Sequence, residues 1–428
     1  MENIKKIIKL KCGNTMHDLT IPESVSLQIA EPKKMKNTQN DSSMIRDALN
    51  KPIASLPIEK IVKKGQRICI ITDDNTRHTP VKKILKELLP RLEKSGINKN
   101  QILIVMALGS HRRMTREEII EKVGKNVFDS YRVINSEFHD KSLMVKIGQS
   151  QMGTPIRVLK EIMEADIRIG IGSIAPHGCM GWSGGAKILY PGITSEDIVS
   201  EFHAMQGLTD DLLYGNEDCH IRLEVEKWTE KIGLHFIINT VFTDSLELYR
   251  VVSGHYVKAH RAGVAFAKDV CGVCVEERPD IVVISSYPLA ADFWQCTKAL
   301  YCGAKVIKEG GTLLLLSPCE EGLGPHKEIC EYIQLEDGKN KLLQKIKRKE
   351  TGDELLAMSV GISIGQIKNR CKIEIITDGV PKEEILKGGF VWHSENDLQK
   401  AFNESLVRYK NPNVLIIPSG GNTVPYLL

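Results

Sequence analysis

The chain alternates short, continuous apolar runs with amphipathic stretches of helical length. Three such runs lie in its first half, at 67–72, 101–107 and 166–171, and the first two precede helix-like segments over 81–94 and 115–123. Apolar runs without polar interruption are typical of parallel strands that are covered on both faces. This pattern predicts βα units and a parallel sheet packed between helices.

Strand-like runs continue through the rest of the chain. Beyond Pro279 they cover residues 281–285, 312–316, 373–377 and 414–418. Alternating apolar and polar residues over 1–31 predict a β-hairpin or a small meander. We therefore expect an α/β fold of two domains, each with a mainly parallel sheet covered by helices. The expected domains are residues 1–272 plus 411–428, which would bind a cofactor, and residues 273–410, with the active site in the cleft between them.

The third run leads into a glycine-rich loop with candidate chemistry. Residues 170–193 include seven glycines, which permit positive φ and close approach of the backbone to a ligand. The loop carries His177 and Lys187. Its SGGAK segment invites comparison with a P-loop, but Ile188 stands where that motif needs Ser or Thr, so a triphosphate site is disfavoured. Lys187 could instead bind a phosphate or form a covalent bond to a cofactor, or it could be an exposed surface lysine.

Polar clusters also follow the first two strands. Asp74 and Arg77 come after the first strand, and His111 and Arg112 come after the second. In open α/β sheets ligands bind beyond the carboxyl ends of the strands, so we expect one site at this edge. His111 and His177 could act there as general acid and base. The two arginines could grip a carboxylate or phosphate, or form salt bridges with the neighbouring aspartates.

Four further candidates lie outside these clusters. His203 could be a core histidine, or a transition-metal ligand if it faces the loop. Gln295 and Lys298 are one helical turn apart and could share a helix face, and Trp294 beside them could form a pocket wall.

Taken together, these motifs resemble those of the nickel-dependent lactate racemases and related 2-hydroxyacid racemases and epimerases. The resemblance runs over essentially the whole chain and is densest from 68 to 203. The motifs that carry it are Asp74-x-x-Arg77, Gly109-Ser-His111-Arg, His177, Ser183-Gly-Gly-Ala-Lys187, His203 and Gln295-x-x-Lys298.

The resemblance implies a nickel-pincer nucleotide as cofactor. This pyridinium-3-thioamide-5-thiocarboxylic acid mononucleotide holds nickel through two sulfur substituents and a ring carbon. By resemblance, Lys187 would hold the nucleotide through a thioamide and His203 would be the nickel ligand from the protein. The residues implied to help hold cofactor or substrate are Asp74, Arg77, Ser183, Gly184 and Gly185.

The resemblance also implies an isomerase that inverts the C2 centre of a 2-hydroxy acid. His111 and His177 would be the two acid/base groups, and Gln295 and Lys298 would orient the substrate carboxylate or the intermediate. The chemistry agrees, because removing a proton beside an ionised carboxylate would build a second negative charge on the same fragment. Moving a hydride to a pyridinium-like acceptor avoids that charge. Hydride return to the other face of a planar 2-keto acid would invert the centre.

Two positions depart from the lactate-active pattern. Trp294 stands where lactate-active members carry tyrosine, and the segment 354–358 lacks the tryptophan that they have nearby. Both positions would border the substrate. The departures leave the cofactor unaffected but put lactate itself in doubt.

Composition narrows the partners and the compartment. A net charge of +4 over 428 residues argues against nucleic-acid and membrane partners. No segment approaches the roughly 18 consecutive apolar residues of a membrane-spanning helix, and no secretion signal is visible. Eleven cysteines without zinc-like pairing fit a reducing compartment, so we expect a cytoplasmic protein. The resemblance adds cofactor-synthesis proteins as partners for maturation.

Two other functions stay open on the sequence. One is a zinc-dependent hydrolase or lyase that uses His177 and His203. The other is a non-catalytic protein that binds a nucleotide or metabolite.

Overall fold

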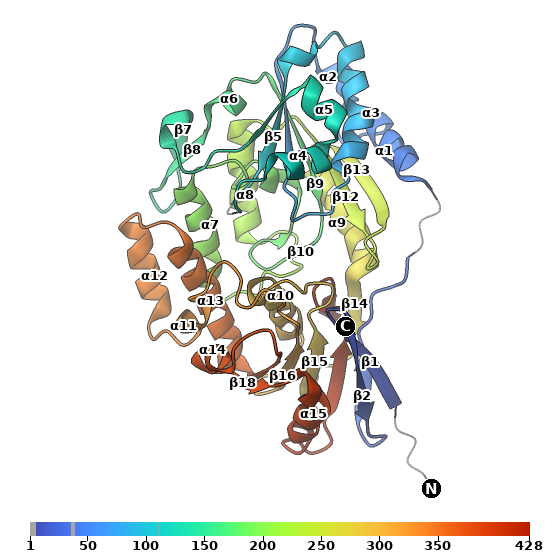
Figure 1. Ribbon diagram of the computed structural model, residues 1–428, viewed down its shortest axis with the longest axis vertical. Helices are drawn as coiled ribbons and strands as arrows, with labels where there is room; N and C mark the ends of the chain where they lie inside the picture. The colour runs from blue at the N-terminus through green and yellow to red at the C-terminus, as the bar shows by residue number, and fades with distance from the viewer. Residues whose placement is uncertain (1–5, 36–38, 110) are drawn as a thin grey trace.

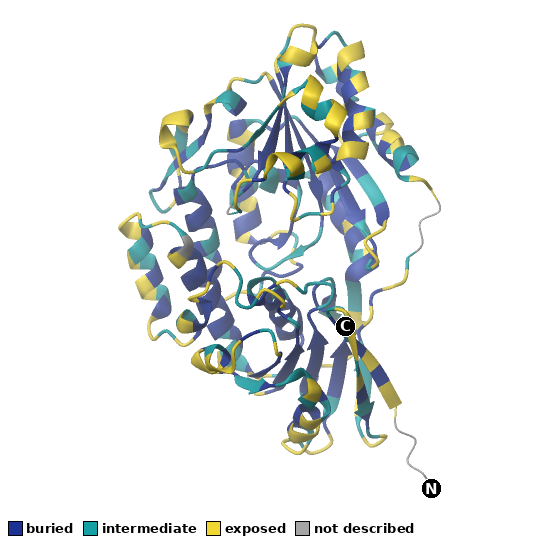
Figure 2. Ribbon diagram, viewed as in Figure 1, coloured by how far each residue is buried: buried dark blue, intermediate teal, exposed yellow. Residues whose placement is uncertain are grey.

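The computed structural model describes residues 6–35, 39–109 and 111–428, so residues 1–5 of the expected hairpin and Ser110 of the Gly-Ser-His motif lie outside the described residues. Two six-stranded sheets dominate the fold, each with helices around it (Figure 1). Buried residues are concentrated in the strands and the inward helix faces, whereas exposed residues gather on the outer helices (Figure 2). The expected α/β architecture is confirmed.

The first sheet is parallel except at one edge. Its strands, in spatial order, are β13 (Leu248–Gly254), β12 (Phe236–Phe242), β9 (Ile167–Ser173), β4 (Ile68–Asp73), β5 (Ile102–Ala107) and β6 (Arg132–Asn135). Only the β12–β13 pair is antiparallel. The three predicted apolar runs form β9, β4 and β5, which are neighbours, so the polar clusters that follow them meet at one edge.

Helices cover both faces of this sheet, which explains the unbroken apolar runs. Ile68 and Ile70 of β4 pack with α1 (Asp41–Asn50), α3 (Val81–Lys94) and α4 (Arg116–Val123). Cys69 and Ile71, which point the other way, pack with α7 (Glu196–Leu208) and α8 (His220–Ile232). The predicted bounds of α3 are confirmed, and Thr115 caps α4 in the expected capping box.

The second sheet is parallel throughout. Its strands, in spatial order, are β18 (Val391–His393), β17 (Lys372–Ile376), β16 (Thr312–Leu316), β15 (Ile281–Ser285), β19 (Asn413–Ile417) and β3 (Ser26–Ile29). One face packs against α10 (Phe293–Ala304), α11 (Ile329–Ile333) and α13 (Asp353–Arg370). The other face packs against α15 (Leu398–Leu406) and against the hairpin of β1 (Lys6–Cys12) and β2 (Thr15–Ile21).

The placement of the two chain ends corrects the expected division. We expected residues 1–272 and 411–428 to form one domain, but β3 and β19 lie side by side in the second sheet. The physical reason is the apolar face of the β1–β2 hairpin, where Leu10 and Leu19 are fully buried against that sheet. The boundary near residue 272 itself stays a prediction.

The two sheets share an apolar contact region. A single buried cluster joins Trp182 and Val252 from the first part of the chain to Phe293 and Leu300 of α10. A smaller cluster joins Ala204 of α7 to α12 (Gly338–Lys347) and α13. Residues that follow β4, β5 and β9 line one cavity together with residues of α10.

The other described elements are connections and short pairs. They are α2 (Ile58–Ile61), η1 (Lys99–Gln101), α5 (Lys125–Ser130), η2 (Lys141–Leu143), β7 (Met144–Gln149), β8 (Pro155–Leu159), α6 (Lys160–Met163), β10 (Pro176–His177), β11 (Gly181–Trp182), η3 (Gly185–Ile188), α9 (Lys258–Cys271), β14 (Gly272–Val275), α14 (Lys382–Lys387), η4 (Glu395–Asp397) and β20 (Val424–Leu427). All eleven cysteines are free thiols. Within the described ranges, no helix is both long and apolar enough to cross a membrane.

Candidate active site

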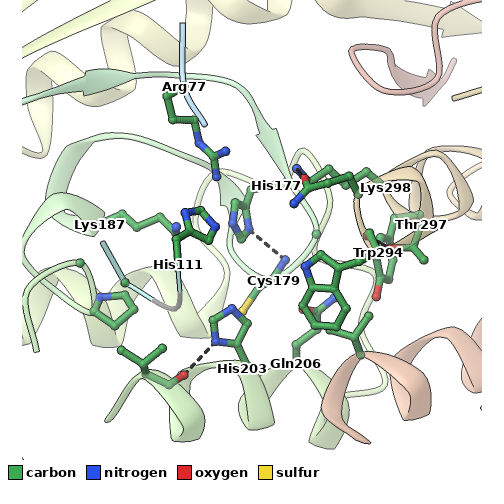
Figure 3. Close-up of a pocket in the computed structure, with 18 of the residues that line it drawn as sticks. Arg77, His111, His177, Cys179, Lys187, His203, Gln206, Trp294, Thr297 and Lys298 are labelled. Carbon is green, nitrogen blue, oxygen red and sulfur yellow. Dashed lines mark hydrogen bonds between the residues drawn. The ribbon is translucent and has the colours of Figure 1, made fainter. Parts of the chain in front are cut away.

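A cavity lies between the carboxyl ends of the first sheet, α7 and α10. It encloses about 800 Å³ of space, part of which is open to solvent. Figure 3 shows the side chains that point into it. The predicted residues that line it are Arg77, His111, His177, Lys187, His203, Trp294, Gln295 and Lys298. An adjoining hollow shares Arg77, His111 and Lys187 and adds Asp74, Ser183 and Gly184. Positions far apart in the sequence thus form one site.

His111 and Asp74 form a tight pair at this edge of the sheet. The Nδ1 of His111 lies 2.5 Å from Oδ2 of Asp74, which is only 3% exposed. Burial alone would raise the pKa of Asp74, but hydrogen bonds from His111 and Thr76 and the charge of Arg77 outweigh it and hold that pKa well below its usual range. The carboxylate therefore accepts the Nδ1 proton of His111, which leaves Nε2 as the ring nitrogen available to a ligand.

His177 is held in the opposite tautomer. Its Nδ1 accepts a hydrogen bond from the backbone N–H of Cys179 at 3.1 Å (Figure 3). Burial, with the charges of Lys187 and Lys298, holds the pKa of His177 well below its ordinary value, so the ring is neutral at pH 7. Its proton consequently sits on Nε2. The two imidazoles of the cavity thus have opposite hydrogen-bond roles at Nδ1, which donates in His111 and accepts in His177.

Three basic side chains converge on the cavity, and none of them has a carboxylate partner among the residues that the structure describes. Burial, then the charge of Arg77, lowers the pKa of Lys187 to about 8 and that of Lys298 to about 7. Lys298 donates to Oε1 of Gln295 at 2.7 Å, and Arg77 donates to the backbone and hydroxyl oxygens of Thr76. The salt-bridge alternative for Arg77 is therefore not seen among the described residues. Such a set suits anions, such as a phosphate and a carboxylate.

Arg112 does not join the site. Its guanidinium pairs with Glu118, 2.6 Å away, and its side chain is 67% exposed. The expectation that Arg112 grips a ligand is wrong, because the capping glutamate of the next helix lies within its reach.

His203 faces the cavity and not the core. Its Nδ1 lies 2.8 Å from the carbonyl oxygen of Val199, one turn earlier on α7, so Nδ1 is the donor and Nε2 is free (Figure 3). Burial lowers its pKa to about 4, which keeps the ring neutral. A neutral imidazole whose other nitrogen is anchored to a backbone carbonyl is the usual form of a metal-binding histidine.

Buried polar side chains from neighbouring elements hold the glycine-rich loop. Asn239 accepts the N–H of Gly185 at 2.8 Å, and Arg222, fully buried on α8, donates to the carbonyls of Trp182 and Gly184. His260 donates through Nε2 to the carbonyl of Ser183 at 2.8 Å. Sequence analysis missed these three residues. Only the first had a visible signal, as a lone amide in an apolar strand.

The substrate-side positions divide into two groups. Trp294 lines the cavity as expected. The segment 354–358 does not; Leu355, Ala357 and Met358 are buried in the packing of α13, and Val360 is the residue of that helix that reaches the cavity.

The residues present fit a nucleotide tethered to Lys187 with a metal at His203. The Lys187 amine makes no hydrogen bond or ion pair with any described residue, and its lowered pKa leaves part of it unprotonated and nucleophilic near neutral pH. Beside it, a Cβ on Gly184 would lie 2.9 Å from Ile174 and 3.0 Å from Asn239 and the carbonyl oxygen of Ser173, so only glycine leaves the loop backbone open there.

A zinc hydrolase site is not supported. Catalytic zinc takes three protein ligands. Among the described residues, the only group of three His, Cys, Asp or Glu ligand atoms within 4.8 Å of one another is Cys12, His17 and Glu395, and none of these lines the cavity of His177 and His203.

Family models match most of the chain. A model described as the lactate racemase N-terminal domain matches residues 12–211, and one described as the lactate racemase C-terminal domain matches residues 275–424. The chain is 26% identical over 399 residues to a lactate racemase of Thermoanaerobacterium thermosaccharolyticum, with 91% of each chain covered. It is 28% identical over 326 residues to a lactate racemase of Lactiplantibacillus plantarum, with 74% of this chain and 76% of that one covered.

Solved structures share the fold. The lactate racemase apoprotein from T. thermosaccharolyticum superposes with a TM-score of 0.87 at 24% identity, covering 98% of this chain and all of that one. A protein from Thermotoga maritima superposes with a TM-score of 0.68 at 19% identity, covering 92% of this chain and all of that one.

Proposed function

This chain belongs to the lactate racemase family and is an isomerase, and from that premise we propose that it inverts the C2 centre of a 2-hydroxy acid by hydride transfer to and from a nickel-pincer nucleotide tethered to Lys187. One observation carries the proposal. The unpaired Lys187 amine shares a single cavity with His203, whose Nε2 is free, and with the oppositely protonated His111 and His177.

The cofactor would occupy the glycine-rich side of the cavity. Lys187 would hold the nucleotide covalently, and Nε2 of His203 would bind the metal. Asp74, Ser183, Gly184 and Gly185 lie beside Lys187 and would border the nucleotide. When bound, the group supplies an acceptor for the hydride that leaves C2. Loading it would require cofactor-synthesis proteins in the producing cell.

The substrate would bind on the side of α10. Lys298, positioned by Gln295, and Arg77 would pair with its carboxylate. Nε2 of His111 would accept the hydroxyl proton as hydride leaves, and Asp74 would stabilise the resulting imidazolium. His177, as the second acid/base group, lies ready to donate a hydrogen bond through Nε2 to the keto oxygen. For His177 to act as a base its proton must move to Nδ1, which the N–H of Cys179 opposes.

Isotope labelling in the holoenzyme tests this mechanism. Single enantiomers of lactate, glycerate, malate and phenyllactate are incubated with cofactor-loaded enzyme in D2O, and recovered acid is examined for optical purity and for deuterium at C2. Hydride transfer predicts inversion of at least one acid with the original hydrogen retained at C2. Deuterium gained at C2 with each inversion would contradict it, and no inversion of any acid would favour a non-catalytic binding protein.

A further inference from the structure

One polar side chain that lines the cavity, Gln206, has been given no role so far. Gln206 lies on α7 one turn after His203, lines the cavity and is 6% exposed. Its amide makes no hydrogen bond with any residue that the structure describes. A buried amide offers two donors and a carbonyl acceptor, and leaving them unpaired costs free energy. Such a group is therefore expected to meet a ligand.

The amide of Gln206 lies beside the backbone that follows His177. A Cβ on Gly178, which follows His177, would lie 3.3 Å from Nε2 of Gln206 and 3.1 Å from the ring of Tyr301. Because Gly178 has no side chain, this amide can lie close to the backbone that follows the candidate acid/base residue His177. In Figure 3, Gln206 lies between His203 and Trp294.

The surrounding wall is partly apolar and adds no charge. Trp294, Thr297, Tyr301 and Val360 complete this side of the cavity, and the ring of His326 packs on Trp294 with centroids 4.1 Å apart. The Lys and Arg side chains that line the cavity are those already assigned to cofactor and carboxylate. A second carboxylate on the substrate would find no cation of its own, and a methyl or phenyl group would leave the amide of Gln206 unpaired.

We propose that the substrate is a 2-hydroxy acid with a further hydroxyl on C3 or C4, and that the unpaired, buried amide of Gln206 selects it. This inference rests on the proposed function and specifies its substrate class. A hydroxyl can donate to the carbonyl of the amide and accept from its N–H. A site that hydrogen-bonds a substrate hydroxyl discriminates against the analogue that lacks it, because the polar group of the site is then left without a partner.

Two matched pairs of acids test the selection. Glycerate and lactate differ by one hydroxyl on C3, and 2,4-dihydroxybutanoate and 2-hydroxybutanoate differ by one on C4. With holoenzyme, kcat/KM for the hydroxylated member of at least one pair is expected to exceed that of its partner by about tenfold or more. Gln206→Leu should lower that ratio by a similar factor.

A matched control separates selection from general damage. Gln366 of α13 donates to the carbonyl of Gly207 at 3.1 Å and lies outside the cavity lining, so Gln366→Leu should leave the ratio unchanged. Ratios near one in both pairs, or a ratio that Gln206→Leu does not lower, would overturn the inference. Loss of the Lys187 adduct in Gln206→Leu would also overturn it, since Gln206 would then serve the cofactor. If none of the four acids is inverted but malate or phenyllactate is, the inference fails while the proposed function stands; the proposed function fails as well only if none of these acids is inverted.

Discussion

Replacing Lys298 with methionine should stabilise the cofactor-free protein. Burial, with the charges of Arg77 and Lys187, lowers the pKa of Lys298 from its ordinary value of 10.5 to about 7. Each pH unit of that difference corresponds to about 1.4 kcal/mol, so a charged Lys298 costs the folded state up to about 5 kcal/mol. The Lys298 ammonium borders a cavity that is open to solvent, and the substitution also removes its hydrogen bond to Gln295. We therefore expect the free energy of unfolding to rise by only about 2 kcal/mol.

The pH dependence gives this prediction its sign. Folded Lys298 binds its proton more weakly than unfolded Lys298, so the wild-type protein gains stability as pH rises from about 7 toward 10.5. The advantage of Lys298→Met should therefore be largest at and below pH 7 and shrink above it.

Urea unfolding of apoprotein at pH 6.5, 8 and 9.5 measures this advantage directly. Lys400→Met, at an exposed position on α15, serves as the control and should change stability little at any pH. A destabilised Lys298→Met protein at pH 6.5, or an advantage that does not shrink as pH rises, would refute the electrostatic argument.

Three further substitutions test other parts of the site. Asp74→Asn should lower kcat of the holoenzyme by about 100-fold or more, because His111 loses the carboxylate that would stabilise its imidazolium. Initial rates of inversion measure this, and a change under threefold would contradict a catalytic role of the Asp74–His111 pair. Arg222→Met should destabilise the protein by about 3 kcal/mol in urea unfolding, because two buried loop carbonyls lose their donor; an unchanged midpoint would contradict the bracing role. Gly184 has φ +77°, and a Cβ there would lie 3.0 Å from the carbonyl oxygen of Ser173. Gly184→Ala should therefore lower the free energy of unfolding by about 2 kcal/mol and reduce the Lys187 adduct seen by intact mass. Full loading at wild-type stability would argue against a tight loop.

The central strands could be predicted from the sequence, because a strand that is buried on both faces forms a continuous apolar run. The runs that form β4, β5 and β9 were identified within two residues, and the structure places these strands side by side. The pairing of β3 with β19 was not accessible. The two strands are almost 400 residues apart in the sequence, and β3 is an edge strand of its sheet. The local pattern of apolar and polar residues does not show which strand an edge strand pairs with.

The candidate site divides in a similar way. Residues with distinctive chemistry at strand ends, such as His111 and Lys187, could be identified from the pattern alone. Arg112 could not be judged, because the position of Glu118 decides its partner. Arg222 and Gln206 were missed for complementary reasons. Arg222 matters because it donates to backbone carbonyls of a loop that is distant in the sequence. Gln206 matters because its amide has no hydrogen-bond partner among the described residues.

The most direct test of the account is the chemical state of Lys187. Protein produced together with the cofactor-synthesis machinery is analysed by intact mass, by peptide mapping and for bound nickel, alongside Lys187→Arg. The account predicts a nucleotide adduct on Lys187 with about one nickel per chain, and neither adduct nor activity in Lys187→Arg. An unmodified Lys187 in protein that still inverts a 2-hydroxy acid would contradict it.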